Sequence, residues 1–347
     1  MSPALNVAAR PRVWVISLGG TITMTAQDGE GIRPSLSAAQ LLAAEPRLSD
    51  IAELEAWTPF TLPGASLTLT HLMEVAAAIQ ARVGASAGDN VPDGVVVVQG
   101  TDTIEDTAFV LDLTLDVDCP VVVTGAMRGP QAPGADGTAN LLAAAIAAAD
   151  PRLRRVGAVV VLNDQIHAAA WTRKSHTSLP SAFTSPAAGP IGWVAEGRVR
   201  LAMRPERPRL PRLHALPAAS RATWPRVAQV SLGLGEDGAL LHALPGLGYA
   251  GVVIEAMGAG HVPAACVEAL REIAGQMPVI LATRVPAGVV FRNTYGFEGS
   301  ERDLLSRGLL SCGSLPASKA RLLLAMLLAS DASAQEIATA FDAFAFG

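Results

Sequence analysis

Short runs of apolar, β-branched residues alternate with longer helical patterns along this chain of 347 residues. In the first half, the runs with the length and composition of buried strands are Val13 to Leu18, Val95 to Val98, Val121 to Thr124 and Val156 to Leu162. The segments with helical length and spacing are Leu72 to Val83, Glu105 to Leu115 and Thr138 to Ala149, the last preceded by Asp136-Gly137 at the expected helix start. This rhythm predicts an α/β fold, with a mostly parallel sheet flanked by helices on both faces.

The second half begins after a predicted hairpin and a change in composition. The hairpin pairs Ile191 to Val194 with Arg198 to Leu201, and prolines interleaved with arginines follow it. Beyond them, strands are predicted at Val227 to Ser231, Gly251 to Ile254 and Val279 to Ala282, and helices at Pro263 to Ala274, Ala317 to Leu328 and Ala334 to Phe344. We therefore expect a larger N-terminal domain over residues 1–203, a linker over 204–225 and a smaller C-terminal α/β domain over 226–347.

Composition limits the classes of protein to which the chain can belong. Hydrophobic residues make up 50% of it, yet no apolar run reaches the roughly 18 residues that a membrane span needs. Residues 1–12 lack the apolar core of a secretion signal, so we expect a cytoplasmic protein. The net charge of −5 argues against a nucleic-acid partner, which requires a basic face.

The cysteines and histidines do not form a metal-binding pattern. Cys119, Cys266 and Cys312 are widely spaced and predict reduced, mostly buried thiols. The six histidines are scattered, and none has the helical spacing of a zinc site. We therefore expect neither a metal nor an organic cofactor.

Two threonines directly follow predicted buried strands. Thr21 stands in Ser-Leu-Gly-Gly-Thr-Ile, and Thr101 stands in Gln-Gly-Thr-Asp-Thr with Asp102 beside it. Open α/β sheets place ligands at the carboxyl ends of their strands, where these hydroxyls are expected. Threonine is a weak nucleophile unless a base assists it, and Lys174 is a candidate for completing such a relay. Taken singly, each motif also fits a simpler structure, a turn for Gly-Gly-Thr and a helix N-cap for Thr-Asp.

Taken together, these motifs resemble those of the bacterial-type L-asparaginase family. The resemblance rests on Gly19-Gly20-Thr21-Ile22, on Gly100 to Thr107, on Gly125 to Arg128 with Ala135-Asp136-Gly137, and on Thr172-Arg173-Lys174, in the family's order across nearly the whole chain. It implies that Thr21 attacks the side-chain amide of L-asparagine, forming an acyl-enzyme and releasing ammonia. It also implies a second triad of Thr101, Asp102 and Lys174, with Asp102 pairing the substrate's ammonium group.

The resemblance further implies which residues bind the substrate and which lie at the interface between subunits. Substrate-binding positions fall on Gly20, Gly64, Ala65, Ser66, Gly100, Asp102, Ala126 and His261. The family assembles as homotetramers or homodimers in which a neighbouring subunit completes each site. Residues 258–261 and Tyr295 are expected at this interface between subunits.

Departures from the family pattern concentrate on substrate recognition. The loop Thr23 to Pro34 lacks the family's tyrosine, and Gly31 or Ile32 falls at its position. Gly64-Ala65 replaces a Ser-Gln pair, with Ser66 as the nearest hydroxyl. These losses predict weak affinity or a different substrate, because each well-placed charged hydrogen bond contributes about 1.5–3 kcal/mol.

The second domain departs from the pattern at two further positions. Gly258-Ala259-Gly260-His261 replaces a Gly-Asn-Gly-Asn motif, and Tyr295 replaces a late glutamate. We expect Tyr295 to supply the missing phenol; an equally good interpretation makes it an interface packing residue.

Three other functions stay open at this point. An amidase acting on glutamine or another small amide retains the same machinery. A non-catalytic amino-acid-binding protein fits the altered recognition residues, although binding alone needs no nucleophile. Residues 233–238 match G-x-G-x-x-G with Glu255 downstream, which we interpret as a turn and only secondarily as a dinucleotide site.

Overall fold

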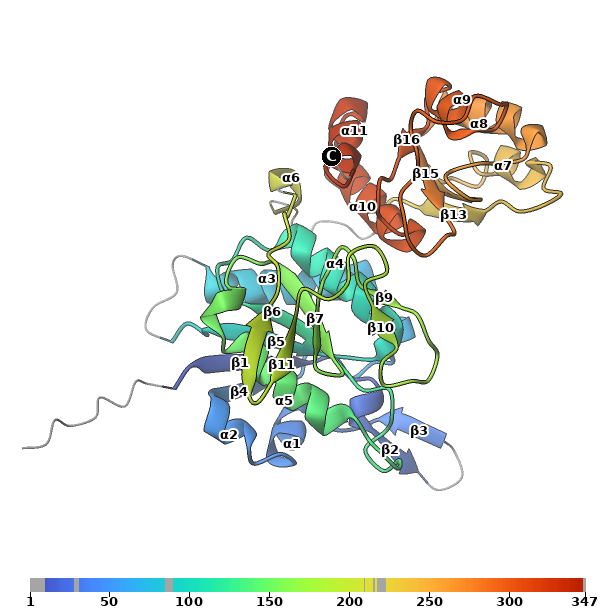
Figure 1. The fold of residues 1–347 in the computed structure, drawn as a ribbon. Coiled ribbons are helices and arrows are strands. Elements are labelled where there is room, and N and C mark those ends of the chain that lie inside the picture. The colour runs from blue at the N-terminus through green and yellow to red at the C-terminus, as the bar shows by residue number, and fades with distance from the viewer. Residues whose placement is uncertain are drawn as a thin grey trace, which may run out of the picture. The chain divides into compact units, whose positions relative to one another are not determined.

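The computed structural model describes residues 10–27, 31–84, 90–208, 210–214, 216 and 223–345, with the side chains of 25–27, 31–32 and 211–212 left out. The chain divides into two units. The first comprises residues 1–185 and 190–207, and the second comprises residues 186–189 and 208–347. In Figure 1 the colours of the first unit run from blue to yellow-green, and those of the second run mainly from yellow to red.

An eight-stranded sheet forms the centre of the described part of the first unit. In spatial order its strands are β12 (Arg198–Leu201), β11 (Gly192–Ala195), β8 (Gln165–Ala168), β7 (Ala158–Leu162), β6 (Val121–Thr124), β5 (Gly94–Val98), β1 (Arg12–Ser17) and β4 (Glu53–Trp57). Strands β4, β1, β5, β6 and β7 pair in parallel, and the remaining pairs are antiparallel. The predicted mostly parallel sheet is confirmed.

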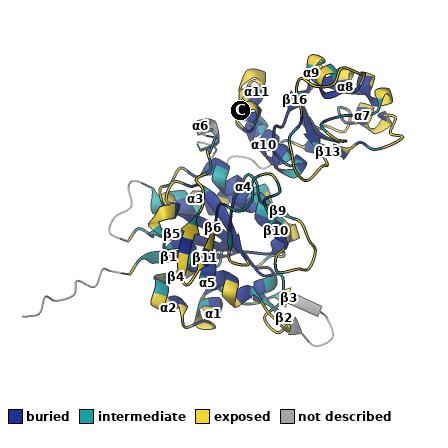
Figure 2. Cartoon of the chain, in the orientation of Figure 1, coloured by how far each residue is buried: buried dark blue, intermediate teal, exposed yellow. Residues whose placement is uncertain are grey.

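Helices cover both faces of this sheet, as Figure 1 shows. They are α1 (Ala38–Ala43), α2 (Leu48–Ile51), α3 (Leu69–Val83), α4 (Ile104–Thr114) and α5 (Gly137–Ala148), with short 3-10 helices η1 (Thr21–Thr23), η2 (Gly64–Ser66), η3 (Thr101–Thr103) and η4 (Pro151–Leu153). Strands β5, β6 and β7 are buried along their whole length because helices lie on both sides of them (Figure 2). The alanines of α5 let this helix approach the sheet closely: a Cβ on Gly94 would lie 1.9 Å from the carbonyl oxygen of Ala148.

Two small antiparallel pairs complete the described part of the first unit. They are β2 (Met24–Gln27) with β3 (Gly31–Pro34), and β9 (Arg173–Lys174) with β10 (Phe183–Thr184). The first pair follows η1, and the second follows the sheet strand β8. The first pair therefore lies directly after Thr21 in the chain, and the second pair contains Lys174.

The second unit contains a smaller parallel sheet in its described part. The order of the strands is β13 (Val227–Ser231), β14 (Gly251–Ala256), β15 (Val279–Thr283) and β16 (Leu310–Ser311). Its helices are α6 (Pro211–His214), α7 (Ala239–Ala243), α8 (Val267–Ala274), α9 (Glu301–Ser306), α10 (Ala317–Ala329) and α11 (Ala334–Asp342), and η5 (Ala264–Cys266) precedes α8. Helix α10 packs against β13, β14 and β15 and is buried on nearly all sides.

The first residues after β12 are bound to the rest of the first unit. Arg204 donates to the backbone oxygens of Arg152 and Arg154, and the Nε of Arg207 lies 2.9 Å from a carboxylate oxygen of Asp112. The side chain of Arg207 is only 20% exposed, because it packs against the first unit at Asp112. Residues 209, 215 and 217–222 of the predicted linker lie outside the described residues.

All three cysteines lie in the described residues, where they are buried and form no disulfide. Burial raises the pKa of Cys119 and of Cys312 to about 12, so both are protonated thiols at neutral pH. Within the described residues, no helix has the length and apolar character needed to cross a bilayer.

Candidate active site

Three short 3-10 helices follow three neighbouring strands of the large sheet. Strand β1 lies between β4 and β5, and all three run parallel. Helix η1 begins at Thr21 after β1, and η3 begins at Thr101 after β5. Helix η2 lies on the segment after β4. The two threonines and the Gly64–Ser66 segment therefore lie at the edge where open α/β sheets place their ligands.

Three glycines bring these segments into direct backbone contact. A Cβ on Gly20 would lie 2.0 Å from the backbone nitrogen of Gly100, and a Cβ on Gly64 would lie 2.8 Å from the carbonyl oxygen of Gly100. Gly20 also has a φ of 89°, which L-residues with side chains rarely adopt. Only glycine fits at this junction, and all three residues are buried. The other two residues of η2, Ala65 and Ser66, are exposed.

A side-chain bridge reinforces the junction. The amide nitrogen of Gln99 donates to the carbonyl of Gly100 at 3.3 Å and to the hydroxyl of Thr103 at 3.1 Å. That hydroxyl donates in turn to the carbonyl of Gly64 at 2.9 Å. Gln99 is fully buried and was not among the predicted site residues. Its position directly before the Gly-Thr-Asp-Thr motif was the only sequence signal for it.

Lys174 meets Thr101 and Asp102, as the sequence predicts. Its Nζ donates to the hydroxyl of Thr101 at 2.9 Å and to the Oδ1 of Asp102 at 2.7 Å. The side chain of Lys174 is 19% exposed, whereas that of Asp102 is 64% exposed. The contacts join residues more than 70 positions apart, and they place a cation on a buried hydroxyl. This is the arrangement in which an ammonium group can exchange a proton with a threonine.

The backbone of Lys174 is held by a residue that sequence reasoning missed. The Oε2 of Glu105, in the first turn of α4, accepts a hydrogen bond from the backbone nitrogen of Lys174 at 2.7 Å. Glu105 is part of the motif that begins at Gly100, but the motif alone does not reveal its partner.

The position of Thr21 is fixed through the backbone of its own helix. The backbone nitrogen and the hydroxyl of Thr23 both donate to the carbonyl of Gly20, at 2.9 and 2.7 Å. The carbonyl of Thr23 accepts from the backbone nitrogens of Ser35 and Leu36. Thr21 itself is half-buried at the start of the helix. Of the loop that lacks the family's tyrosine, residues 28–30 and the side chain of Ile32 lie outside the described residues.

Ala126 lies in a turn that Asp136 organises. The carboxylate of Asp136 accepts from the backbone nitrogens of Met127 at 3.0 Å and of Arg128 at 2.8 Å. The side chain of Asn140 donates to Asp136 and to the carbonyl of Gly125, both at 3.0 Å. Asp136 occupies the N-cap position of α5 as predicted, but its carboxylate holds the turn rather than the helix start. Ala126 has no exposed surface.

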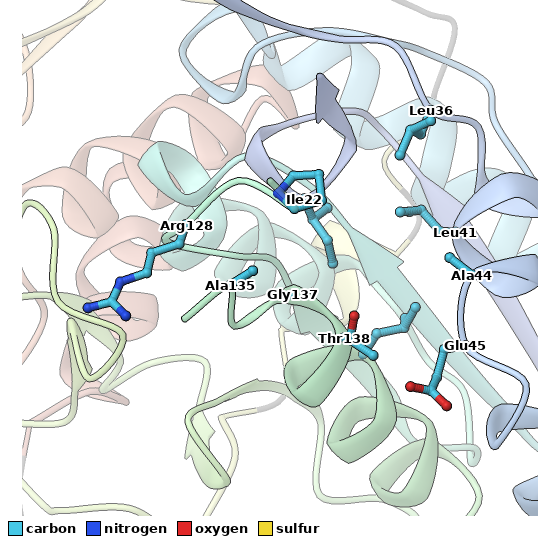
Figure 3. Close-up of a pocket in the computed structure, with 11 residues that line it drawn as sticks. Ile22, Leu36, Leu41, Ala44, Glu45, Arg128, Ala135, Gly137 and Thr138 are labelled. Carbon is cyan, nitrogen blue, oxygen red and sulfur yellow. The ribbon is translucent and has the colours of Figure 1, made fainter. Parts of the chain in front are cut away.

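A small pocket lies beside η1, and Figure 3 shows its lining. It has a volume of about 100 Å³. Its lining residues are Ile22, Leu36, Leu41, Ala44, Glu45, Arg128, Pro130, Ala135, Gly137, Thr138 and Leu141. None of the predicted site residues lines it, so this pocket is distinct from the threonine–lysine centre.

His261 and Tyr295 come together in the second unit. Their ring centroids are 4.7 Å apart with an edge-to-face angle of 85°. Two glycines with positive φ, Gly258 and Gly260, form the turn before His261. The ring of Phe297 lies 5.1 Å from that of His261, and Tyr295 is 41% exposed. The two predicted residues thus belong to one aromatic cluster with an exposed side.

A buried carboxylate anchors this cluster. The Oε1 of Glu301 accepts from the backbone nitrogens of Thr294 and Tyr295, at 2.8 and 2.7 Å, and its Oε2 lies 3.3 Å from the Nε2 of His261. Burial acts to raise the pKa of Glu301, but the N–H groups of Tyr295 and Thr294 and the nearby His261 outweigh it and lower the pKa. Glu301 begins α9 and carried no sequence signal of its own.

The glycine motif at residues 233–238 forms a turn, as we interpreted it. Gly238 has a φ of 80° and precedes α7, which has only five residues. The carboxylate of Asp237 accepts from the backbone nitrogen of Ala239 at 2.9 Å. A carboxylate therefore already occupies the helix start at which a pyrophosphate is bound in dinucleotide folds.

Comparison with known proteins decides the family. The model for the N-terminal domain of asparaginases matches residues 12–207, and the model for the glutaminase/asparaginase C-terminal domain matches residues 226–341. The chain belongs to the asparaginase family. A probable L-asparaginase of Deinococcus radiodurans is 36% identical to it over 346 residues, which covers 96% of this chain and 98% of the relative.

Two other relatives of the asparaginase family cover similar lengths. An L-asparaginase of Bacillus licheniformis is 32% identical over 321 residues, covering 92% of this chain and 96% of the relative. A probable periplasmic L-asparaginase of Haemophilus influenzae is 29% identical over 347 residues, covering 98% and 95%. The resemblance stated from the motifs thus extends over nearly the whole chain.

Proposed function

We propose that this protein hydrolyses the side-chain amide of L-asparagine to L-aspartate and ammonia. Its asparaginase-family membership supports the reaction class. The observation that carries the proposal is the contact of the Lys174 ammonium with the Thr101 hydroxyl and the Asp102 carboxylate. This pairing favours hydrolysis over binding alone, because binding requires no proton transfer.

In the proposed reaction, Thr21 is the nucleophile. Its hydroxyl oxygen attacks the side-chain amide carbon, the C–N bond breaks, and the hydroxyl proton passes to the departing nitrogen, which leaves as ammonia. The resulting ester between Thr21 and the aspartyl group is then hydrolysed by water, which restores the hydroxyl. Two such steps replace one difficult amide hydrolysis.

The second threonine serves proton transfer in this scheme. Lys174 and Thr101 relay protons to and from the reacting groups, and Asp102 orients the lysine through its hydrogen bond to the Nζ. The exposed part of Asp102 also binds the ammonium group of the substrate. Backbone N–H groups at the junction of Gly20 and Gly100 stabilise the negative charge that develops on the amide oxygen.

The substrate's remaining contacts define a second candidate function. We propose that Ser66, the turn at Ala126 and His261 replace the family's usual recognition residues. Because these groups offer fewer fixed polar partners, glutamine or another small amide is the alternative substrate. The family of the C-terminal domain includes glutaminases, which favours glutamine among these.

The assembly and the compartment are part of the same proposal. We propose a homotetramer or homodimer in which His261 and Tyr295 complete the site of a neighbouring subunit, with Tyr295 supplying the phenol. The exposed aromatic side of their cluster supports this role. We also propose a cytoplasmic location, supported by three buried free thiols, which suit a reducing compartment.

Ammonia release by the purified protein tests the proposed reaction. L-Asparagine, L-glutamine and D-asparagine are compared as substrates, with Thr21→Val as the matched variant that keeps the shape but lacks the hydroxyl. We expect release from L-asparagine that the variant lacks. Absence of release from every amide, with fold and assembly intact, would contradict the proposal and favour a binding protein.

A further inference from the structure

Lys174 is held at both ends by one short segment of the chain. Residues Thr101 and Asp102 bind its Nζ, and Glu105 binds its backbone nitrogen. These three partners lie within one turn of the start of α4, because η3 runs directly into that helix. The distance from the lysine backbone to the hydroxyl of Thr101 is therefore set by a single rigid element.

The contact with Glu105 matters because the strand that carries Lys174 is very short. Strand β9 contains two residues and pairs with the two residues of β10, with Lys174 opposite Phe183. The backbone nitrogen of Ser175 donates toward β10, to the carbonyl of Ala182 at 2.7 Å. The backbone nitrogen of Lys174 donates instead to α4, through Glu105 at 2.7 Å. This hydrogen bond therefore ties the β9–β10 pair to the helix that carries the site.

The position of Glu105 suits this task. It lies in the first turn of α4, where the helix dipole favours a carboxylate. Hydrogen bonds between a charged acceptor and a backbone N–H are shorter and stronger than neutral ones, and the 2.7 Å distance is at the short end of the usual range.

We propose that Glu105 is a positioning residue that fixes Lys174 on Thr101. This inference rests on the proposed function, in which Lys174 relays protons. Glu105 acts through the lysine and binds neither substrate nor reacting atoms. Its role is to supply an acceptor oxygen, which the charge strengthens but which a neutral amide at this position also offers. A misplacement of about 1 Å costs as much as 10²-fold in rate, so a loosened lysine is expected to slow turnover without weakening substrate binding.

Two variants of Glu105 separate the acceptor from the charge. Glu105→Gln keeps an acceptor oxygen at the same distance and is expected to retain at least about a third of kcat. Glu105→Leu removes the acceptor and is expected to lower kcat about 10- to 100-fold with KM changed less than about 3-fold. Glu74→Leu, on the exposed side of α3, controls for the loss of a surface charge. If the Leu variant does not fold, Glu105→Ala carries the same expectation.

A double variant shows whether Glu105 acts through the lysine. In a Lys174→Met background, Glu105→Leu is expected to cost nothing further, because the group it positions is gone. A full additional loss there would overturn the inference, as would an unchanged kcat in Glu105→Leu or an equal loss in Glu105→Gln. A Lys174→Met variant with normal activity would instead refute the proposed proton relay.

Discussion

The two units present ionisable groups in opposite ways. In the first unit, Lys174 and Asp102 form an open charge pair over the buried hydroxyl of Thr101. In the second, Glu301 is fully buried and the aromatic rings around His261 and Tyr295 are partly exposed. The first arrangement suits proton transfer, because an ammonium group lies within hydrogen-bond distance of a hydroxyl. The second suits recognition, because the carboxylate of Glu301 holds the aromatic residues in place while their rings stay partly exposed.

The largest effect should follow from breaking the charge pair of the first unit. Lys174→Met is expected to lower kcat for ammonia release by about 10²–10⁴-fold, the usual contribution of general acid–base groups. Its melting temperature should change little, because partly exposed ion pairs contribute only about 0–1 kcal/mol to folding. Steady-state kinetics and thermal melting measure both. A variant with wild-type kcat would show that the pair is structural.

The buried His167 of the first unit should make folding sensitive to acid. Burial lowers the pKa of His167 on β8 from 6.5 to about 4, and its Nδ1 lies 2.9 Å from the hydroxyl of Ser185. Between pH 4 and pH 6.5 the imidazole of His167 is protonated in the unfolded chain and neutral in the folded protein. The free energy of unfolding should therefore fall by about 3 kcal/mol as the pH drops from 6.5 to 4.

Denaturant titrations at several pH values measure this acid response. His167→Asn should remove most of it, whereas His176→Asn, at an exposed position, should leave it intact. An unchanged pH dependence in His167→Asn would show that other groups cause the acid sensitivity.

The two sites also differ in what holds them, because backbone contacts between glycines organise the first and a side chain anchors the second. A Cβ on Gly100 would lie 2.7 Å from the nitrogen of Gly64, so Gly100→Ala should cost about 1–3 kcal/mol of stability. Gly129→Ala is the matched control, because nothing lies within 4 Å of its Cβ position. Urea unfolding of both variants measures the difference. Equal stabilities would mean that the junction yields easily.

The smallest effect is expected in the aromatic cluster of the second unit. Tyr295→Phe keeps the ring that packs on His261 and removes only the hydroxyl. One hydrogen bond contributes about 0.5–1.5 kcal/mol, so kcat should fall about 2- to 10-fold if the phenol assists the reaction. Turnover assays on the assembled protein measure this. Unchanged turnover would leave Tyr295 as a packing residue.

The sequence predicted the elements that are buried on both sides. The valine runs of β5, β6 and β7 are buried at every position, and this pattern indicates strands covered on both faces. Strand β4 was missed because glutamates occupy its exposed positions at the edge of the sheet. Strands β9 and β10 are too short to leave any periodic signal.

The residues of the candidate site likewise divide into those that a sequence pattern predicted and those that it missed. Thr101, Asp102 and Lys174 were predicted together because their motifs are specific, and they do meet in the structure. Glu105 and Glu301 were missed because their roles depend on contacts that only folding creates. The partner of Glu105 lies 69 positions away in the chain, and no local pattern records that distance.

The most direct test of the account is to trap the intermediate. Rapid acid quenching during turnover of L-asparagine, followed by peptide mass spectrometry, locates any covalently bound aspartyl group. We predict an aspartyl ester on the peptide that contains Thr21, absent from Thr21→Val. An ester on the peptide that contains Thr101, or turnover with wild-type kcat in Thr21→Val, would contradict the assignment of Thr21 as the nucleophile.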